Sequence, residues 1–597
     1  MTIFHKSTFE KYIVTFTIVL IASYWAIQIN EGKKWVNSDS ISEDVEMTYN
    51  YLPALLIYGD VSCNYKFALD KHIQYKIWTK KTQDGKPYFK QTIGTSIAVL
   101  PFFGIAHIVA KNTHYNADGY SEIYALFLLI SGLFYGAMGL LLIAALLQHY
   151  FNNWLIALTL LTVAISTNLN YYVTDHLYSH VYSFCTIALF MWLTHKWYTS
   201  KKLTTAILVG LTLGFNILIR PPNGVIVLFF VFYRFSSIKE QFLMFKNEFK
   251  HLVVMGLATL LGISIQLFYW KVTTGHWFIS TYDAHTFGYF NNPQISNILY
   301  SYRKGWLVYT PIMTFAVLGL FFGTKKYMKL AILFTLLAHI YIISSWNAWW
   351  FGGSYGARAM VDYYALLAFP LAAFYKRFNR AWFLIVPIGI ALTLLNIFQE
   401  YQHKKGLFHW EGMTKEAYWS VWGKTAFPMG YNKNIVRPDM DRTLKGKDEY
   451  VGSIEQFKLN SAEIILGNKE QGSYVLDSAH QISPNYTFGL ENKYVHNARN
   501  RYVVHVYFNT QEASSIEQYY FWVGFLDQNF KIKFGEELLP WPGNVSTVAQ
   551  NDFAVYKDWF DPFNKGDSLF VSGAYKFGKP IQIDSVKLEH FVYLFND

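Results

Sequence analysis

The sequence is poor in charged residues and in cysteine, and both shortages narrow the class of protein. Only 15% of its 597 residues are charged, whereas a soluble globular chain carries about 25%. Its two cysteines, Cys63 and Cys185, show no metal-ligand spacing, so the sequence predicts neither a disulfide framework nor a zinc site. We expect no metal and no cofactor.

Several catalytic signatures are missing as well. The chain has no Gly-rich phosphate loop, no HExxH helix and no GxSxG elbow. Nucleotide-driven transport and hydrolase activity therefore have no supporting motif. The net charge of +11 could indicate nucleic-acid binding, but the basic residues cluster between apolar blocks, which is typical of membrane topology. We predict no nucleic-acid partner.

Hydrophobic sequence is abundant, at 52% of the residues, and it forms long blocks up to about residue 398. A membrane span needs roughly 20 apolar residues, although shorter spans occur. The first block lacks a small-residue cleavage site, so we expect a retained helix rather than a signal peptide. The 11 candidate spans are 12–30, 122–147, 154–173, 180–195, 203–219, 222–235, 251–270, 306–323, 327–345, 360–375 and 381–398.

One further apolar stretch, Gly94–Ala110, contains Pro101 and His107 and could either cross the membrane or lie in its interface. Basic connections should be cytoplasmic under the positive-inside rule. They are consistent with a cytoplasmic N-terminus only if Gly94–Ala110 does not cross. We therefore predict an outer juxtamembrane helix there. The basic connections lie near residues 196–202, 234–250, 325–329 and 376–380.

The chain is predicted to have a membrane part, 1–398, whose first outer loop is 31–121, then a connector, 399–450, and a soluble part, 451–597. The soluble part contains short runs of β-branched and aromatic residues, such as Arg501–Tyr507, separated by turn signals. Such runs predict an all-β sandwich or jelly roll. The fold class is thus a polytopic α-helical membrane protein of about 11 spans with an extracytoplasmic β domain.

An acidic cluster follows the first span, in the predicted outer loop and next to an aromatic run that includes Tyr49. A carboxylate at the membrane boundary could deprotonate an acceptor hydroxyl. The alternative is a solvated acidic turn with no catalytic role. The members of the cluster are Asp39, Glu43, Asp44 and Glu46.

A second polar cluster begins at Asn168 and contains Asp175, His176 and His180. It lies at the outer end of one predicted span and enters the next. Titratable groups at membrane depth are costly, which makes these residues functional candidates. The alternative is structural, with Asp175 as the N-cap of a helix from Leu177.

Basic residues are also expected at the outer interface. Arginine can bind phosphate through two parallel hydrogen bonds, so these groups suit an anionic lipid head group. The alternative is snorkelling of long side chains to the membrane surface. The basic residues are Arg220, Arg303, Lys304 and Arg358.

The segment before Arg358 contains Trp349 and Trp350, which suit a membrane interface or the face of a sugar. Asp362 follows Arg358 by four residues, so the two would share one face of a helix.

Taken in order, these pieces resemble the GT-C superfamily of integral-membrane glycosyltransferases, particularly its bacterial protein-mannosyltransferase and aminoarabinose-transferase-like members. The resemblance covers about residues 1–400. The matching pieces are Asp44 before Tyr49–Ala54, Lys90–Gly94 before the juxtamembrane helix, Asp175 with His180, Arg220 with Pro221, Lys304–Gly305 before Tyr309–Pro311, and Gly353–Arg358.

The resemblance implies an outward-facing active site and a sugar donor linked to polyprenyl phosphate. It implies a base or acceptor-binding aspartate in the first outer loop, which would be Asp44, with Glu43, Glu46 and Asp39 as rivals. Asp175 is a further catalytic candidate. The donor phosphate would then meet Arg220, Arg358, Lys304, Arg303 and Lys90. The acceptor or sugar would meet His180, His176, Tyr49, Trp349, Trp350 and Asp362.

The metal-binding acidic pair of the oligosaccharyltransferases is not clearly present, so we predict an inverting transfer without a metal. The resemblance also implies a location in the bacterial inner membrane. The N-terminus would be cytoplasmic, and the acceptor would be an extracytoplasmic lipid, glycan or protein. Two alternatives differ in class: a transporter or flippase of lipid-linked sugars, and a non-catalytic membrane anchor presenting a carbohydrate-binding sandwich.

Overall fold

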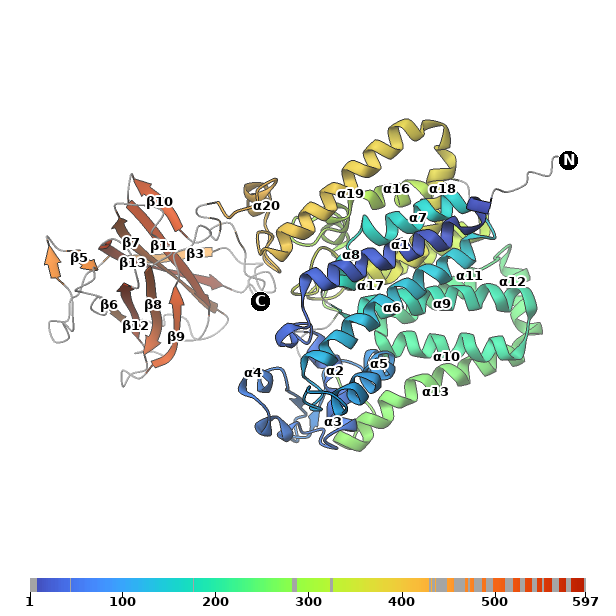
Figure 1. Ribbon diagram of the computed structural model, residues 1–597, viewed down its shortest axis with the longest axis horizontal. Coiled ribbons are helices and arrows are strands. Elements are labelled where there is room, and N and C mark those ends of the chain that lie inside the picture. The colour runs from blue at the N-terminus through green and yellow to red at the C-terminus, as the bar shows by residue number, and fades with distance from the viewer. Residues whose placement is uncertain are drawn as a thin grey trace. The chain divides into compact units, whose positions relative to one another are not determined.

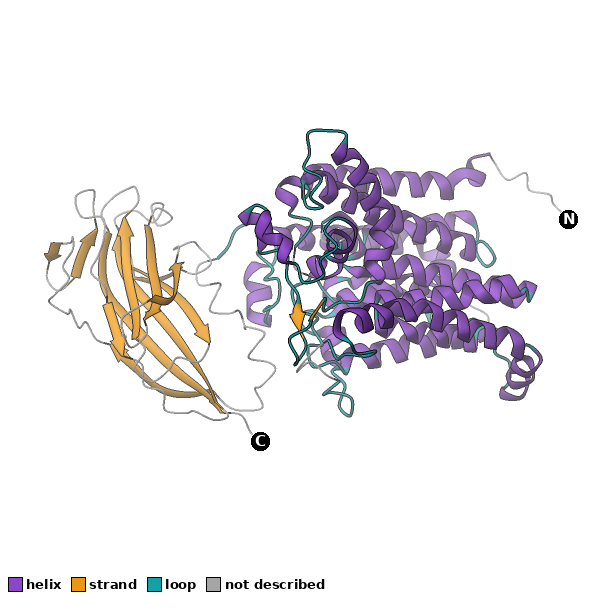
Figure 2. Cartoon of the chain, turned by 90° about the horizontal axis from the view of Figure 1, so that it is seen from below, coloured by secondary structure: helices purple, strands orange, loops and turns teal. Residues whose placement is uncertain are grey.

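The computed structural model describes residues 8–428 apart from 43, 176, 282–286 and 323–325, together with residues 431 and 435 and the strands of the C-terminal part. The chain divides into two compact units, Met1–Tyr401 and Gln402–Asp597. The first unit is mainly a bundle of helices, and the long strands belong to the second (Figures 1 and 2).

Most of the longer helices of the first unit lie in the predicted apolar blocks, whereas Ile238–Asn247 lies in a predicted basic connection. The longer ones are α1 (Thr8–Gly32), α5 (Gly94–Lys111), α6 (Glu122–Leu147), α7 (Asn153–Ile165), α9 (Ser179–Ser200), α10 (Leu203–Ile219), α12 (Ile238–Asn247), α13 (Phe249–Thr274), α17 (Lys326–Ser344), α18 (Tyr364–Arg377) and α19 (Trp382–Lys404).

Short helices connect these or extend them. The short α-helices are α2 (Asp44–Tyr49), α3 (Tyr51–Leu56), α4 (Lys71–Gln74), α8 (Leu169–Thr174), α11 (Val227–Phe232), α14 (Ile295–Tyr300), α15 (Trp306–Tyr309), α16 (Thr314–Gly319) and, in the second unit, α20 (Lys415–Val421). The 3₁₀ helices are η1 (Val36–Ser38), η2 (Asn64–Ala68), η3 (Pro221–Ile226), η4 (Pro311–Met313), η5 (Arg358–Tyr363) and η6 (Asn379–Ala381).

Six helices in the described part of the chain are long and apolar enough to cross a membrane: α1, α5, α6, α13, α17 and the helix from Asn379 to Lys404. The chain is accordingly a multi-pass membrane protein. The other predicted spans are shorter, less apolar or broken. In 306–323, for example, Pro311 separates α15 from α16, because proline has no backbone N–H to continue a helix. The crossing of these segments, and the total of about 11 spans, stay predictions.

The two flanks of α5 bind the same short segment of residues 31–121, the predicted first outer loop. Before α5, the Tyr51 hydroxyl donates to the Gln91 carbonyl over 2.7 Å. After α5, the Tyr49 hydroxyl donates to the Gly119 carbonyl over 2.6 Å. Although α5 has the length and composition of a span, the chain therefore enters and leaves it next to residues 49–51.

Glycines let α10 approach α13 closely. A Cβ at Gly210 would lie 2.3 Å from the Met255 carbonyl oxygen, and one at Gly214 would lie 2.6 Å from the Thr259 carbonyl oxygen. Only glycine fits there, as at other close contacts between membrane helices. This packing fixes the end of α10, which leads directly into Arg220.

The strands of the second unit form two sheets in which every described pairing is antiparallel. The seven-stranded sheet has the order β10-β11-β7-β13-β5-β4 with β3 on β13, and the four-stranded sheet has the order β6-β12-β8-β9. The predicted strand at Arg501–Tyr507 lies within β7. The sandwich arrangement stays a prediction.

The strands are β3 (Asp448–Glu455), β4 (Asn468–Glu470), β5 (Ser473–Leu476), β6 (Tyr486–Gly489), β7 (Ala498–Thr510), β8 (Tyr519–Leu526), β9 (Ile532–Leu538), β10 (Val545–Ala549), β11 (Asp552–Phe560), β12 (Ser568–Tyr575) and β13 (Ile581–Leu594). A small hairpin in the first unit pairs β1 (Lys80–Lys81) with β2 (Pro87–Tyr88).

Candidate active site

Asp44 and Arg358, which are more than 300 residues apart, form an ion pair. The Asp44 Oδ2 lies 2.5 Å from the Arg358 Nη2. The Arg358 side chain is 11% exposed and the Asp44 side chain 31%, so the carboxylate is the more accessible partner. Burial alone would lower the pKa of Arg358, but the Asp44 carboxylate outweighs it, so the pKa rises and the guanidinium stays charged.

The guanidinium of Arg358 has a second fixed neighbour. Its Cζ lies 4.6 Å from the centre of the Tyr178 ring, which is within the range of a cation–π interaction. Its Nη1 also donates to the Gly353 carbonyl over 3.4 Å. Arg358 is thereby held between the loop before η5 and the residues that open α9.

The segment around Asp44 is fixed by its neighbours in the predicted first outer loop. Trp78 Nε1 donates to the Glu46 carboxylate over 3.1 Å. Lys76 Nζ donates to the Ser38 carbonyl over 2.7 Å, and burial lowers the pKa of this lysine. The Tyr49 hydroxyl donates a hydrogen bond to the Gly119 carbonyl. Glu46 and Tyr49 therefore support α2, and a sugar contact by Tyr49 stays a prediction.

Asp362, Arg220 and His180 form a second buried cluster. Arg220 Nη1 donates to Asp362 Oδ2 over 2.6 Å, and His180 Nδ1 lies 2.8 Å from Asp362 Oδ1. The Asp362 and His180 side chains are 2% and 3% exposed. A buried carboxylate needs such partners, because an unpaired charge away from water is costly. One oxygen of Asp362 thus accepts from Arg220, and the other lies against His180.

The two clusters are joined through η5, which begins at Arg358 and contains Asp362. A 3₁₀ helix rises about 2 Å per residue, so four residues separate the two backbones by about 8 Å. Asp44, Arg358, Asp362, Arg220, His180 and Tyr178 therefore belong to one continuous polar site built from four distant parts of the sequence.

Arg303 and Lys304 are buried rather than extended to the membrane surface, so the snorkelling alternative is wrong for both. The Arg303 guanidinium lies 3.7 Å from the centre of the Trp350 ring and 5.8 Å from that of Trp349. Lys304 Nζ donates to the Ser354 carbonyl. Both basic residues thus brace the segment that leads to Arg358.

Buried polar side chains also hold the loop that leads to Arg358, through hydrogen bonds to Tyr355. The Tyr172 hydroxyl accepts from the Tyr355 N–H over 3.0 Å and donates to the Tyr355 carbonyl over 3.1 Å. The Asn168 amide also donates to the Tyr355 carbonyl, and the Tyr355 hydroxyl donates to the Asn396 carbonyl over 3.1 Å. Gly356 follows with φ +60°, a conformation that favours glycine.

Sequence reasoning missed Asn396 and Glu400. The Asn396 amide donates to the Tyr309 carbonyl over 2.6 Å, and Glu400 Oε2 accepts from the Asn170 amide over 2.8 Å. Both residues are buried on α19. The two residues could have been recognised from the sequence, because an amide and a carboxylate are unusual inside an apolar helix.

Removal of the Tyr172 hydroxyl tests the role of this buried scaffold. We expect Tyr172→Phe to destabilise the protein by about 1–3 kcal/mol, because the Tyr355 N–H is left without its partner. The loop carrying Arg358 should loosen, so the KM for the lipid-linked donor that the sequence predicts should rise more than kcat falls. Thermal unfolding and steady-state kinetics measure the two effects. Tyr12→Phe on the exposed side of α1 serves as the control.

The remaining predicted residues fall in several places. Asp175 is the C-cap of α8, and its carboxylate lies 3.7 Å from Lys34 Nζ. It does not cap the following helix, which begins at Ser179, so the proposed N-cap at Asp175 is wrong. Lys90 precedes Thr92, whose hydroxyl donates to the Ile219 carbonyl next to Arg220. Glu43 and His176 lie outside the described residues.

Within the residues that the structure describes, no group of three or more His, Cys, Asp or Glu side chains is arranged to hold a metal ion.

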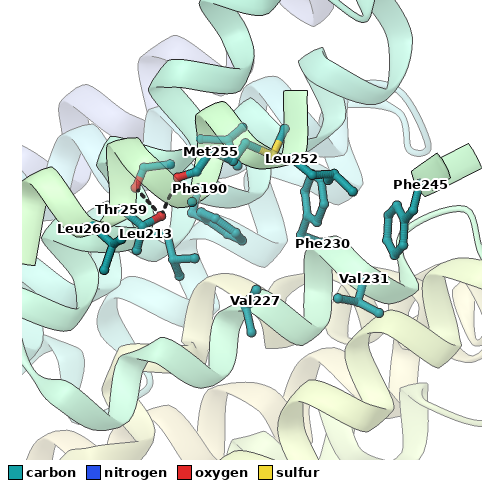
Figure 3. A pocket seen from close by; sticks show the side chains of 13 residues that line it. Phe190, Leu213, Val227, Phe230, Val231, Phe245, Leu252, Met255, Thr259 and Leu260 are labelled. Carbon is teal, nitrogen blue, oxygen red and sulfur yellow. Dashed lines mark hydrogen bonds between the residues drawn. The ribbon is translucent and has the colours of Figure 1, made fainter. Parts of the chain in front are cut away.

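An apolar cavity of about 460 Å³ lies among α9, α10, α11, α12 and α13. Leu213 of α10, Val227 of α11 and Met255 of α13 line it, together with aromatic rings such as Phe230 (Figure 3). Leu213 precedes Arg220 by seven residues, which is about 10 Å along the helix axis. Two of the helices that line the cavity, α10 and α11, thus flank the segment that contains Arg220.

No protein-family model and no curated protein matches the chain. Among solved structures it is similar to the archaeal oligosaccharyltransferase AglB from Archaeoglobus fulgidus, in complex with an inhibitory peptide and a dolichol-phosphate, with 12% identity, a TM-score of 0.39, and coverage of 68% of this chain and 57% of that chain. It is also similar to the arabinosyltransferase EmbB from Mycobacterium smegmatis, with 12% identity, a TM-score of 0.29, and coverage of 81% and 59%.

One neighbour is named as an oligosaccharyltransferase and the other as an arabinosyltransferase. This chain spans less than two thirds of the length of either one.

Proposed function

We propose that this protein is a membrane glycosyltransferase of the GT-C type, which transfers a sugar from a polyprenyl-phosphate-linked donor to an acceptor outside the cytoplasm. The observation that carries the proposal is the ion pair between Asp44 and Arg358, next to the cluster of Arg220, Asp362 and His180. One site thereby contains a carboxylate that can accept a proton and two guanidinium groups that can bind a phosphate.

The proposed sidedness follows from the basic connections and from α5. Because both flanks of α5 bind residues 49–51, we infer that α5 lies along the outer membrane surface and does not cross. The N-terminus is then cytoplasmic, and the first outer loop with Asp44 faces outward. The same assignment places the C-terminal domain outside a bacterial inner membrane.

The donor phosphate is assigned to Arg358 and Arg220. Cleavage of the donor leaves the bonding electron pair on the phosphate, and positive groups held in place stabilise the developing charge. Asp362 and His180 hold Arg220, and Lys304 and Arg303 brace the loop that carries Arg358. We therefore assign these four residues to positioning the two arginines rather than to contacts with the sugar.

The base is assigned to Asp44. Its carboxylate takes the proton of an acceptor hydroxyl, and the acceptor oxygen forms a bond to the anomeric carbon of the donor sugar. The bond between that carbon and the phosphate oxygen breaks at the same time, so the attack comes from the opposite side and inverts the configuration. This sequence of events balances without a metal or a redox partner.

The apolar cavity is assigned to the hydrocarbon chain of the donor. A cavity of this size is typical of a ligand site, and two of its walls, α10 and α11, are joined through Arg220 and η3. A lipid whose phosphate lies at Arg220 can therefore extend its chain directly between them.

Filling the cavity should discriminate between long and short donors. We expect Leu213→Trp to raise the KM for a long-chain polyprenyl donor about tenfold, because several buried methylene contacts are lost. A water-soluble short-chain donor should be used as before. Leu208→Trp, on the lipid-exposed side of the same helix, should change neither value. Steady-state kinetics with both donors measures the effect.

Transfer itself is tested by reconstituting the full chain in nanodiscs and adding a set of polyprenyl-phosphate sugars with membrane extract. Mass spectrometry should detect free polyprenyl phosphate and an acceptor heavier by one sugar. Movement of an intact lipid-linked sugar, without cleavage, would instead support the transporter alternative.

A further inference from the structure

We propose that the donor phosphate releases the catalytic base: it displaces Asp44 from Arg358, so that Asp44 is free to accept a proton only when a donor is bound. This inference rests on the proposed function and adds an order of events to it. The donor binds first, and the acceptor is activated second.

The unused hydrogen-bonding capacity of Arg358 supports the exchange. Asp44 contacts Nη2, whereas the buried Nε has no hydrogen-bond partner among the residues that the structure describes. Nε and Nη2 form the edge of a guanidinium that binds an oxyanion through two parallel bonds. An unsatisfied buried donor is costly. A phosphate that bonds to both nitrogens satisfies Nε, which the contact of Asp44 with Nη2 does not.

The surroundings of the ion pair make Asp44 the partner that leaves. Arg358 is held by the Tyr178 ring and the Gly353 carbonyl, and its side chain is 11% exposed. The Asp44 side chain is 31% exposed, so its carboxylate can rotate into water and regain hydration when it leaves the pair. A phosphate therefore replaces the more exposed anion on a buried, fixed cation.

The exchange also explains why the base does not activate an acceptor before a donor is bound. While Asp44 Oδ2 is paired with the Arg358 guanidinium, that oxygen is not available to an acceptor hydroxyl. Once the phosphate has taken the guanidinium, this oxygen is free to accept the proton.

The test is equilibrium binding of undecaprenyl phosphate to the full chain in nanodiscs. If Asp44 competes with the phosphate, Asp44→Asn should bind this lipid more tightly, by about tenfold, because a neutral amide competes weakly for a charged donor. Asp39→Asn makes the same change of net charge in the same loop and should leave the affinity unchanged. Asp44→Ser should behave as Asp44→Asn does, which guards against a folding defect in one variant.

Equal or weaker binding by both Asp44 variants overturns the inference, and so does equal tightening by Asp39→Asn, which would mean general electrostatics. These outcomes are separate from a failure of the proposed function. That failure would appear as a wild-type protein that binds undecaprenyl phosphate but never cleaves a sugar from it.

Discussion

Replacing Asp44 by asparagine is expected to reduce sugar transfer by about 10²- to 10⁴-fold, which is the usual contribution of a positioned general base. Asparagine has nearly the shape of aspartate but cannot accept the proton of the acceptor hydroxyl. The fold should survive, because Asp44 is partly exposed and the rest of α2 is held by Tyr49 and Glu46. The measurement is the rate of formation of free polyprenyl phosphate.

The neighbouring acids provide the controls for this experiment. Asp39→Asn and Glu46→Gln remove a charge from the same loop, and Glu46 contacts Trp78 rather than Arg358. Both variants should keep most of the activity. A normal rate for Asp44→Asn would remove the base assignment, and a large loss in Asp39→Asn would transfer that assignment to another member of the acidic cluster.

The second large effect is expected from Arg220. Arg220→Gln removes the guanidinium from the buried carboxylate of Asp362, and loss of one partner of a buried ion pair costs about 3–5 kcal/mol. The protein should therefore unfold at a lower temperature and lose donor binding together. Thermal unfolding in detergent measures the first effect, and binding of undecaprenyl phosphate measures the second.

Two further variants show whether the lower stability of Arg220→Gln comes from loss of the ion pair with Asp362. Asp362→Asn combined with Arg220→Gln removes both charges, so the double variant should be more stable than Arg220→Gln alone. Arg377→Gln changes an exposed arginine near the end of α18 and should alter stability by no more than about 0.5 kcal/mol. If Arg220→Gln were as stable as Arg377→Gln, the buried pair would not exist.

Much of the helical architecture was predictable, because membrane helices form long runs of apolar residues that can be recognised in the sequence. The predicted block 122–147 coincides with α6, and 203–219 coincides with α10. Breaks inside blocks were less visible. Pro311 divides 306–323 into short helices, while Pro101 lies inside the continuous helix α5. The effect of a proline depends on whether neighbouring elements satisfy the backbone groups that it frees.

Individual site residues were predictable, but their pairing was not. A costly charge at membrane depth identifies Arg358 or Asp362 as a candidate without naming a partner. The contact of Asp44 with Arg358 depends on how the first outer loop folds back over η5, which no local pattern encodes. The supporting role of Trp350 beneath Arg303 depends on the same kind of long-range packing.

The most direct test is an experimental structure of the protein with undecaprenyl phosphate bound. We predict phosphate oxygens within hydrogen-bond distance of the Arg358 guanidinium and of Arg220, the lipid chain between α10 and α11, and Asp44 separated from Arg358. A lipid phosphate bound elsewhere, with the pair of Asp44 and Arg358 intact, would contradict the proposed site.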